Sequence, residues 1–138
     1  MDALSERGVE YLSVEKAILK NWQLVFDIME PEIEGMGYAD IIPIDGEVVE
    51  GAVFLLKDRK SLKALDRYEG VPEFYLREEV IVELENNIPI SCFTYVANPF
   101  NTSSNLKPTK AYLQEILAGK PFFSDAYFKK IREIKTLD

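Results

Sequence analysis

The sequence contains no histidine and only one cysteine, Cys92. The lack of histidine excludes Ser-His-Asp and Cys-His catalysis, and it excludes histidine-ligated zinc, iron or copper sites. A single cysteine permits no disulfide within the chain, which fits a reducing compartment. We therefore expect any general base to be a carboxylate, a lysine, a tyrosine or the lone thiol.

Positive charge and long apolar segments are also scarce. Lysine and arginine number 16 against 24 aspartates and glutamates, which gives a formal net charge of -8. Nucleic-acid phosphates repel a chain this acidic, so we expect no nucleic-acid partner. The apolar run 51–56 is far shorter than the roughly 20 residues that a membrane span needs. Because the first residues also lack the pattern of a secretory signal, we expect a cytoplasmic protein with no membrane partner.

The composition is otherwise that of a soluble globular domain. Apolar residues make up 47% and charged residues 29% of the 138 residues. A chain of this length can bury one sizeable hydrophobic core. Since no internal repeat or interdomain linker interrupts the sequence, we expect residues 1–138 to form a single domain.

The first part of the sequence predicts strands. A short helix capped by Asp2 precedes them. Residues 14–26 are apolar with polar interruptions, which predicts one long or two short strands. Residues 39–44 and 47–56 predict two further strands. The Asp-Gly pair at positions 45 and 46 is typical of a hairpin turn, because both central residues of a type I′ turn need positive φ.

A helix and a second hairpin follow. Ser61 is expected to cap a helix that Gly70 ends. Residues 76–84 and 88–97 predict two strands joined by a turn at two consecutive asparagines.

Two helices complete the expected order. Residues 109–117 have the apolar spacing of an amphipathic helix, and Ser124 is expected to cap the last helix. Strands, a helix, more strands and two helices predict an α+β fold. We expect a mostly antiparallel sheet closed into a small β-barrel with flanking helices.

Glu69 is the candidate acid/base residue. It falls in the last turn of the helix expected before Gly70, where unpaired backbone carbonyls carry partial negative charge. A carboxylate is disfavoured there by roughly 0.3–1 kcal/mol, and its pKa is raised. A raised pKa suits a general base that works near neutral pH. The residue types alone leave open the alternative of a solvated surface glutamate.

Two charged neighbours of this helix each allow two interpretations. Asp66 is either a second carboxylate of a site or a side chain that bonds nearby backbone or Arg67. Arg77 either binds a substrate carboxylate with two hydrogen bonds or faces Glu79 on an exposed strand.

Tyr75 and Tyr95 lie on the strands that flank the Glu69 turn. They either line a pocket or pack in the core. Cys92 falls in the middle of a strand, so we interpret it as an inert core thiol. The acidic segment 30–34 lacks the spacing of a calcium loop, and we expect no metal site.

Several segments, taken in order, resemble one known family. The most specific is Leu-Asp-Arg-Tyr-Glu-Gly-Val at positions 65–71. The others are 37–43, 49–54, 75–77, 94–96 and 107–109 with Tyr112. Together these segments are similar to the gamma-glutamylcyclotransferase superfamily, and the resemblance covers essentially the whole chain.

This resemblance implies a small closed barrel, often dimeric, without a cofactor. Family enzymes cyclise a gamma-glutamyl group to 5-oxoproline and release the attached amino acid or amine. Glu69 matches the family's acid/base glutamate, and Gly70, Tyr75 and Tyr95 match substrate-binding positions. The chemistry suits a chain without histidine, because the attacking amine belongs to the substrate and one carboxylate can move the proton. The implied partners are a small gamma-glutamyl substrate and a second copy in a homodimer.

The family's first strand ends in Tyr-Gly-Ser-Asn, a turn whose backbone N–H groups bind substrate. Aligned by the segments that follow, Met1 falls just after this motif. We therefore expect an open gap in the sheet beside the strands that follow Val14 or Glu47, and little release of 5-oxoproline. Two alternatives stay open, a non-catalytic binding module on the same barrel and an enzyme for gamma-glutamylamines.

Overall fold

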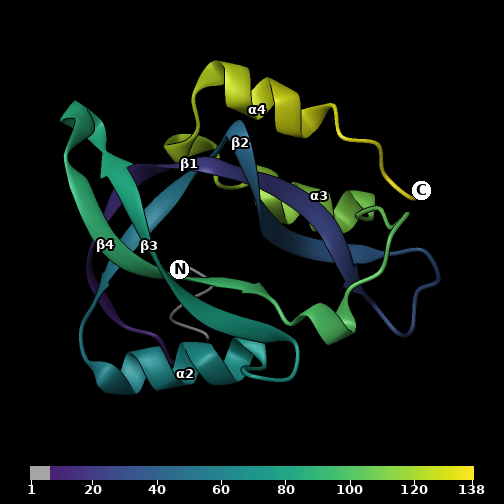
Figure 1. The fold of residues 1–138 in the computed structure, drawn as a ribbon, viewed down its shortest axis with the longest axis horizontal. Helices are drawn as coiled ribbons and strands as arrows, with labels where there is room; N and C mark the ends of the chain where they lie inside the picture. The colour runs from purple at the N-terminus through teal and green to yellow at the C-terminus, as the bar shows by residue number, and fades with distance from the viewer. Residues whose placement is uncertain (1–6) are drawn as a thin grey trace.

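The computed structural model describes residues 7–138 (Figure 1). They form one antiparallel sheet with α-helices, so the expected α+β class is confirmed. The helix expected at Asp2 lies outside the described residues. The main elements are β1 (Tyr11–Met29), β2 (Gly37–Leu56), α2 (Arg59–Glu69), β3 (Tyr75–Leu84), β4 (Pro89–Ala97), α3 (Lys110–Leu117) and α4 (Asp125–Arg132).

The sheet has the strand order β2-β1-β3-β4, with every neighbouring pair antiparallel. Within residues 7–138 no ladder joins β2 to β4, so the hydrogen-bonded sheet is open and the expected barrel closure is not seen. The strand that contains Val14 pairs with β2 along most of its length, but among the described residues it pairs with β3 only at Ala17 and Ile18. The strand after Glu47 belongs to β2 and does form a sheet edge.

The two longest strands, β1 and β2, pair along almost their whole length and bend together in the middle. Lys20 pairs with Val48 and Trp22 with Pro43, so residues 44–47 stand opposite Asn21 alone. Asn21 has a φ of 66°, and its Oδ1 accepts a hydrogen bond from Gly46 N at 3.0 Å. The hairpin expected at positions 45 and 46 is therefore wrong. The Asp-Gly pair forms a bulge in a continuous strand, because both halves of β2 pair with β1 rather than with each other.

The second predicted hairpin is confirmed. β3 and β4 pair from Tyr75 opposite Ala97 to Glu83 opposite Pro89. Asn86 and Asn87 connect them with φ values of 72° and 62°. Asparagine tolerates this left-handed conformation better than most residues, which explains why the local sequence was sufficient here.

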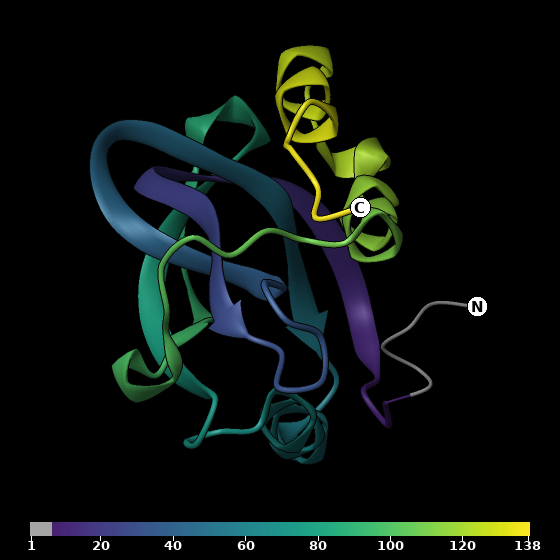
Figure 2. The same cartoon turned by 90° about the vertical axis from the view of Figure 1, so that its right-hand side faces the viewer.

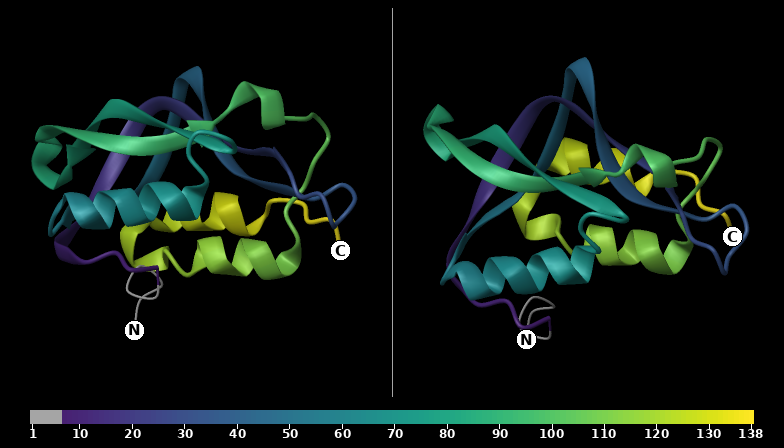
Figure 3. Two further views of the ribbon diagram at one scale, coloured as in Figure 1. Left: turned by 90° about the horizontal axis from the view of Figure 1, so that it is seen from below. Right: turned by 60° about the horizontal axis from the view of Figure 1, so that its bottom comes forward.

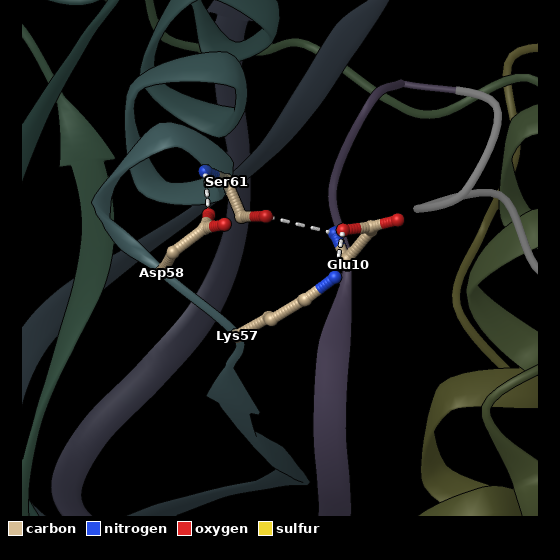
Figure 4. Close-up of polar contacts among 4 residues, drawn as sticks. All are labelled: Glu10, Lys57, Asp58 and Ser61. Carbon is tan, nitrogen blue, oxygen red and sulfur yellow. Dashed lines mark hydrogen bonds and ion pairs between the residues drawn. The ribbon is translucent and has the colours of Figure 1, made fainter.

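The start of α2 is held by a polar cluster that also contacts the residue before β1 (Figure 4). Asp58 is the N-cap, and its Oδ1 accepts from Ser61 N at 2.9 Å, so the cap expected at Ser61 lies three positions earlier. Ser61 Oγ instead accepts from Glu10 N at 3.0 Å, and Lys57 pairs with the Glu10 carboxylate at 3.2 Å. These contacts fix where α2 begins. Gly70 ends the helix as predicted, with a φ of 72°.

Two hydrophobic clusters lie on different parts of the sheet. One is built from strands β1 and β3, and Cys92 packs against it as a half-buried thiol, in agreement with its interpretation as a core residue. The other joins α3 and α4 to the second half of β1, and Thr109 and Ser124 cap these helices. Figures 1 and 2 show α2 at one end of the molecule and α4 at the other, with α3 between them. The buried members are Ala17, Leu19, Val80 and Val82 in the first cluster and Leu113, Leu117, Tyr127 and Ile131 in the second.

None of the helices in residues 7–138 is both long enough and apolar enough to cross a membrane.

Candidate active site

A polar cavity of about 750 Å³ opens at the C-terminal end of α2, the helix at the front of both views in Figure 3. Glu69 is the last residue of this helix and lines the cavity. The left-handed Gly70 and the following Pro72 turn the chain away at this point, which leaves the final helical side chain at the cavity wall. Its polar lining residues are Arg7, Glu30, Tyr38, Tyr68, Glu69, Tyr75, Thr109, Tyr112 and Glu115.

The Glu69 carboxyl is half-buried, and its electrostatic environment has two opposing parts. Burial raises its pKa above the ordinary value, because removal of water disfavours the charged form. The positive charge of Arg7 lowers the pKa and partly opposes this effect. The Arg7 guanidinium also stacks on Tyr68, 3.7 Å from the ring centroid, which holds the charge at the cavity.

Three tyrosines form one wall of the cavity around the Ala39 peptide group. Tyr75 donates its hydroxyl hydrogen to Ala39 O at 2.7 Å, and the Tyr112 hydroxyl accepts from Ala39 N at 2.9 Å. Tyr38 donates to Glu30, which is the main cause that raises the pKa of Tyr38 to about 12. Burial raises the pKa values of Tyr75 and Tyr112 as well. All three side chains are therefore neutral hydrogen-bonding groups at physiological pH.

Tyr95, which the resemblance assigned to substrate binding, does not line this cavity. Its hydroxyl donates to Asp66 Oδ1 at 2.6 Å, and Arg77 Nη1 donates to Asp66 Oδ2 at 2.7 Å. Asp66 therefore anchors α2 to the β3–β4 hairpin rather than to nearby backbone or Arg67. Arg77 is engaged in this ion pair with Asp66. Its position therefore matches neither of the two roles considered for it, which were substrate binding and a contact with Glu79.

A pair of aspartates close to the tyrosine wall was not anticipated from the sequence. Asp40 is 5% exposed, and its Oδ1 accepts from Ile41 N and Ala97 N, both at 2.8 Å. The pKa of Asp27 is raised to about 7. Burial is the largest cause, and a hydrogen bond with Asp40 and the charge of Asp40 add to it. Asp27 Oδ1 is buried without a hydrogen-bond partner among the described residues.

Sequence reasoning also missed Arg7 and Tyr38 as cavity residues. The aspartate pair and Arg7 had no local signal, because only strand pairing and helix packing bring these segments together. Gly70, which was expected to bind substrate, does not line the cavity. In the structure it ends helix α2. Within residues 7–138, no three or more acidic or cysteine side chains converge in a way that would hold a metal ion.

The cavity thus combines three glutamates, of which Glu69 has a raised pKa, with one arginine and neutral tyrosines. A half-buried carboxylate can accept and return a proton, and an adjacent guanidinium can bind an anionic group. This arrangement suits a small zwitterionic ligand that carries both an ammonium group and a carboxylate.

Comparison with known proteins identifies the family. Residues 2–115 match the sequence model of the family described as gamma-glutamyl cyclotransferase, AIG2-like. A solved structure described as gamma-glutamyl cyclotransferase is 25% identical, with a TM-score of 0.78 over 94% of this chain and 77% of that one. An uncharacterised protein from Homo sapiens gives 25% identity and a TM-score of 0.79 over the same shares.

YkqA from Bacillus subtilis is 22% identical, with a TM-score of 0.73 over 88% of this chain and 45% of that one, and it supports the fold alone. No curated protein sequence matches the chain. Because the family model spans most of the sequence, the chain belongs to the gamma-glutamyl cyclotransferase, AIG2-like family.

Proposed function

We propose that this protein cyclises a gamma-glutamyl amino acid or peptide to 5-oxoproline and releases the attached amine. The proposal is based on the position of Glu69. This side chain lies half-buried at the end of α2 and lines the cavity, and the pKa of its carboxyl group is raised. Membership of the family supports the same chemistry.

In the proposed reaction, Glu69 accepts a proton from the substrate ammonium group. The free amine then attacks the gamma-carbonyl carbon, and a new C–N bond closes the five-membered ring. Glu69 returns this proton to the leaving nitrogen, and the bond from the gamma-carbonyl carbon to that nitrogen breaks. Glu69 then takes the second proton from the ring nitrogen and passes it to the released amine, which departs as an ammonium. Because nucleophile and electrophile belong to one molecule, the protein has to hold the geometry and move these two protons.

Arg7 is the group through which this site would bind the carboxylate of its substrate. It is the only lysine or arginine among the described residues that line the cavity. Its guanidinium can form two parallel hydrogen bonds to the alpha-carboxylate of a gamma-glutamyl group. The tyrosine wall at Tyr75 and Tyr112 supplies a rigid, neutral surface for the substrate's carbon chain.

The test is release of 5-oxoproline by wild-type protein and by Glu69→Gln. The amide keeps the shape of the side chain but cannot accept and return a proton, so turnover should fall by roughly 10²–10⁴-fold. The thermal midpoint should stay the same or rise, because a partly desolvated carboxylate is replaced by a neutral group. Glu85→Gln, on an exposed turn, is the matched control and should behave as wild type. Turnover retained in Glu69→Gln would exclude Glu69 as the base.

Two substrate sets distinguish the leaving groups. Gamma-glutamyl dipeptides carry a second carboxylate on the leaving amine, whereas gamma-glutamylamines do not. Parallel assays with both sets show which class turns over.

A second function, binding without turnover, is favoured by the position of Arg7 beside Glu69. A positive and a negative group in one cavity match the two charges of a zwitterionic ligand. Under this alternative, calorimetry would show that wild-type protein binds a gamma-glutamyl dipeptide while no 5-oxoproline forms.

A further inference from the structure

A pair of carboxyl groups, Asp27 and Asp40, lies next to the tyrosine wall of the active-site cavity without lining the cavity itself. Asp27 is on β1, in a register shift beside Ala39 of β2. Asp40 directly follows Ala39 in the sequence. The hydroxyl groups of Tyr75 and Tyr112 hold the N–H and C=O groups of Ala39. The carboxyl pair is therefore adjacent to the backbone on which the wall is built.

Asp40 also connects this wall to strand β4. Its Oδ1 accepts from Ala97 N at 2.8 Å, and Ala97 pairs with Tyr75 in the β3–β4 ladder. The Tyr75 hydroxyl in turn donates to Ala39 O, in the residue before Asp40. These contacts form a closed loop through β2, β3 and β4. The position of the Tyr75 side chain at the cavity thus depends on the bond that Asp40 makes to Ala97.

The geometry of the carboxyl pair favours the presence of one proton. With both groups ionised, the buried Asp27 Oδ1 has no hydrogen-bond partner among the described residues, and the two negative charges repel each other. A proton on Asp27 removes both costs, because a neutral carboxyl group can donate to Asp40. Asp40 Oδ1 already accepts from the backbone N–H groups of Ile41 and Ala97, so Asp27 is the donor of the pair.

The surroundings of the pair supply no positive charge. Within residues 7–138, neither carboxyl group forms an ion pair. Asp40 on β2 is the charged group that acts on Asp27, and Tyr75 on β3 is the titratable group that senses both carboxyl groups. Ser103 N donates to the backbone oxygen of Asp27 and not to its side chain. Loss of the proton therefore leaves two adjacent negative charges without compensation.

We infer that Asp27 and Asp40 are positioning residues for the active site, because a proton shared by the pair holds the tyrosine wall in place and loss of this proton releases it. Ionised Asp27 repels Asp40, which weakens the bond to Ala97 N and lets Tyr75 move. Since the pKa of Asp27 is raised to about 7, the hold is complete at lower pH and is lost as the pH rises through this value. The consequence for substrate rests on the proposed function, whereas the hold on the wall does not.

Proton NMR of the Ala97 amide tests this hold without any substrate. Wild-type protein and Asp27→Asn are titrated from pH 5 to pH 8.5. In wild type the Ala97 amide signal should move upfield with a midpoint at about pH 7, because its hydrogen bond to Asp40 lengthens. Asp27→Asn should show no such step, because asparagine donates to Asp40 at every pH. The Ser124 amide, which donates to the Glu50 carboxylate, is the internal control and should show no step at this pH.

Two results of this titration would overturn the inference. A downfield step of the Ala97 amide would mean that the added negative charge polarises a hydrogen bond that stays intact, so the wall is not released. The absence of a step in wild type, or the same step in Asp27→Asn, would mean that the proton of Asp27 does not act on Asp40.

Kinetics with gamma-glutamylalanine then separate positioning from chemistry. The wild-type KM should rise about tenfold between pH 6 and pH 8, which is the equivalent of one lost hydrogen bond. The KM of Asp27→Asn should stay constant, and that of Asp27→Ala should be high throughout, because alanine cannot donate to Asp40. The values of kcat for wild type and Asp27→Asn should agree at each pH, because Glu69 is unchanged.

The two experiments have separate outcomes. Equal pH profiles of KM in wild type and Asp27→Asn would overturn the positioning role. The absence of turnover in wild type and in both variants would refute the proposed function alone. In that case the Ala97 titration would still decide whether the carboxyl pair holds the wall.

Discussion

Replacement of Asp27 by asparagine should change how the stability of this protein depends on pH. In the folded protein, burial and the neighbouring Asp40 raise the pKa of Asp27 from 3.8 to about 7. Between these pH values the folded state holds a proton that the unfolded state has lost. The stability that this proton contributes is therefore complete below pH 3.8 and is lost as the pH rises towards 7.

The size of the effect follows from the pKa change and from the exposure of the carboxyl group. At about 1.36 kcal/mol for each pH unit, the full change corresponds to roughly 4 kcal/mol. Asp27 is only half-buried, so water screens much of this interaction. We therefore expect about 1–2 kcal/mol. Asparagine keeps the shape of the side chain and can donate a hydrogen bond to Asp40, but it cannot ionise.

The measurement is urea denaturation of both proteins from pH 4.5 to pH 8. Asp27→Asn should match wild type at pH 4.5 and exceed its free energy of unfolding by about 1–2 kcal/mol at pH 8. Asp45→Asn, at an exposed position of the β2 bulge, is the control and should show no pH-dependent difference. The reasoning would be refuted if the difference in free energy of unfolding between wild type and Asp27→Asn were the same at every pH. It would also be refuted if wild type became more stable relative to the variant as the pH rises.

Three further predictions concern α2 and its neighbours. Arg7→Gln removes the charge that lowers the pKa of Glu69, so carbon-13 NMR should report a higher titration midpoint than in Arg7→Lys; a lower midpoint would contradict this. Asp58→Ala removes the helix cap and should cost about 1 kcal/mol in urea denaturation, whereas unchanged stability would show that the cap is dispensable. Gly70→Ala should cost about 1–2 kcal/mol or more. Its Cβ would lie 2.7 Å from Phe74 Cδ2, and a loss below that range would mean that the ring moves aside.

The sequence by itself determined the elements whose signals are local. Asn86 and Asn87 specify the β3–β4 turn because the required positive φ is a property of those two residues. Gly70 ends α2 for the same reason, and this stop places Glu69 in the last turn of the helix. The N-cap was predicted at Ser61 but lies three residues earlier at Asp58, because aspartate is an equally good capping residue.

Tertiary structure decided the features that depend on partners far away in the chain. An Asp-Gly pair suits a hairpin, but whether the flanking segments pair with each other or with β1 depends on which hydrogen bonds and side-chain contacts are available. The contact between Tyr95 and Asp66 spans 29 positions, so the residue types alone could not show that the Tyr95 hydroxyl bonds to α2.

The aspartate pair shows the same limit for electrostatics. Asp27 and Asp40 are 13 positions apart in the sequence, and nothing in the residue types indicates that their carboxyl groups meet. Strand pairing between β1 and β2 brings their carboxyl groups together, and partial burial and the neighbouring Asp40 raise the pKa of Asp27 to about 7. Residue types and spacing determine which groups can ionise. Burial and proximity, which arise only when distant segments pack, determine the pH at which they do so.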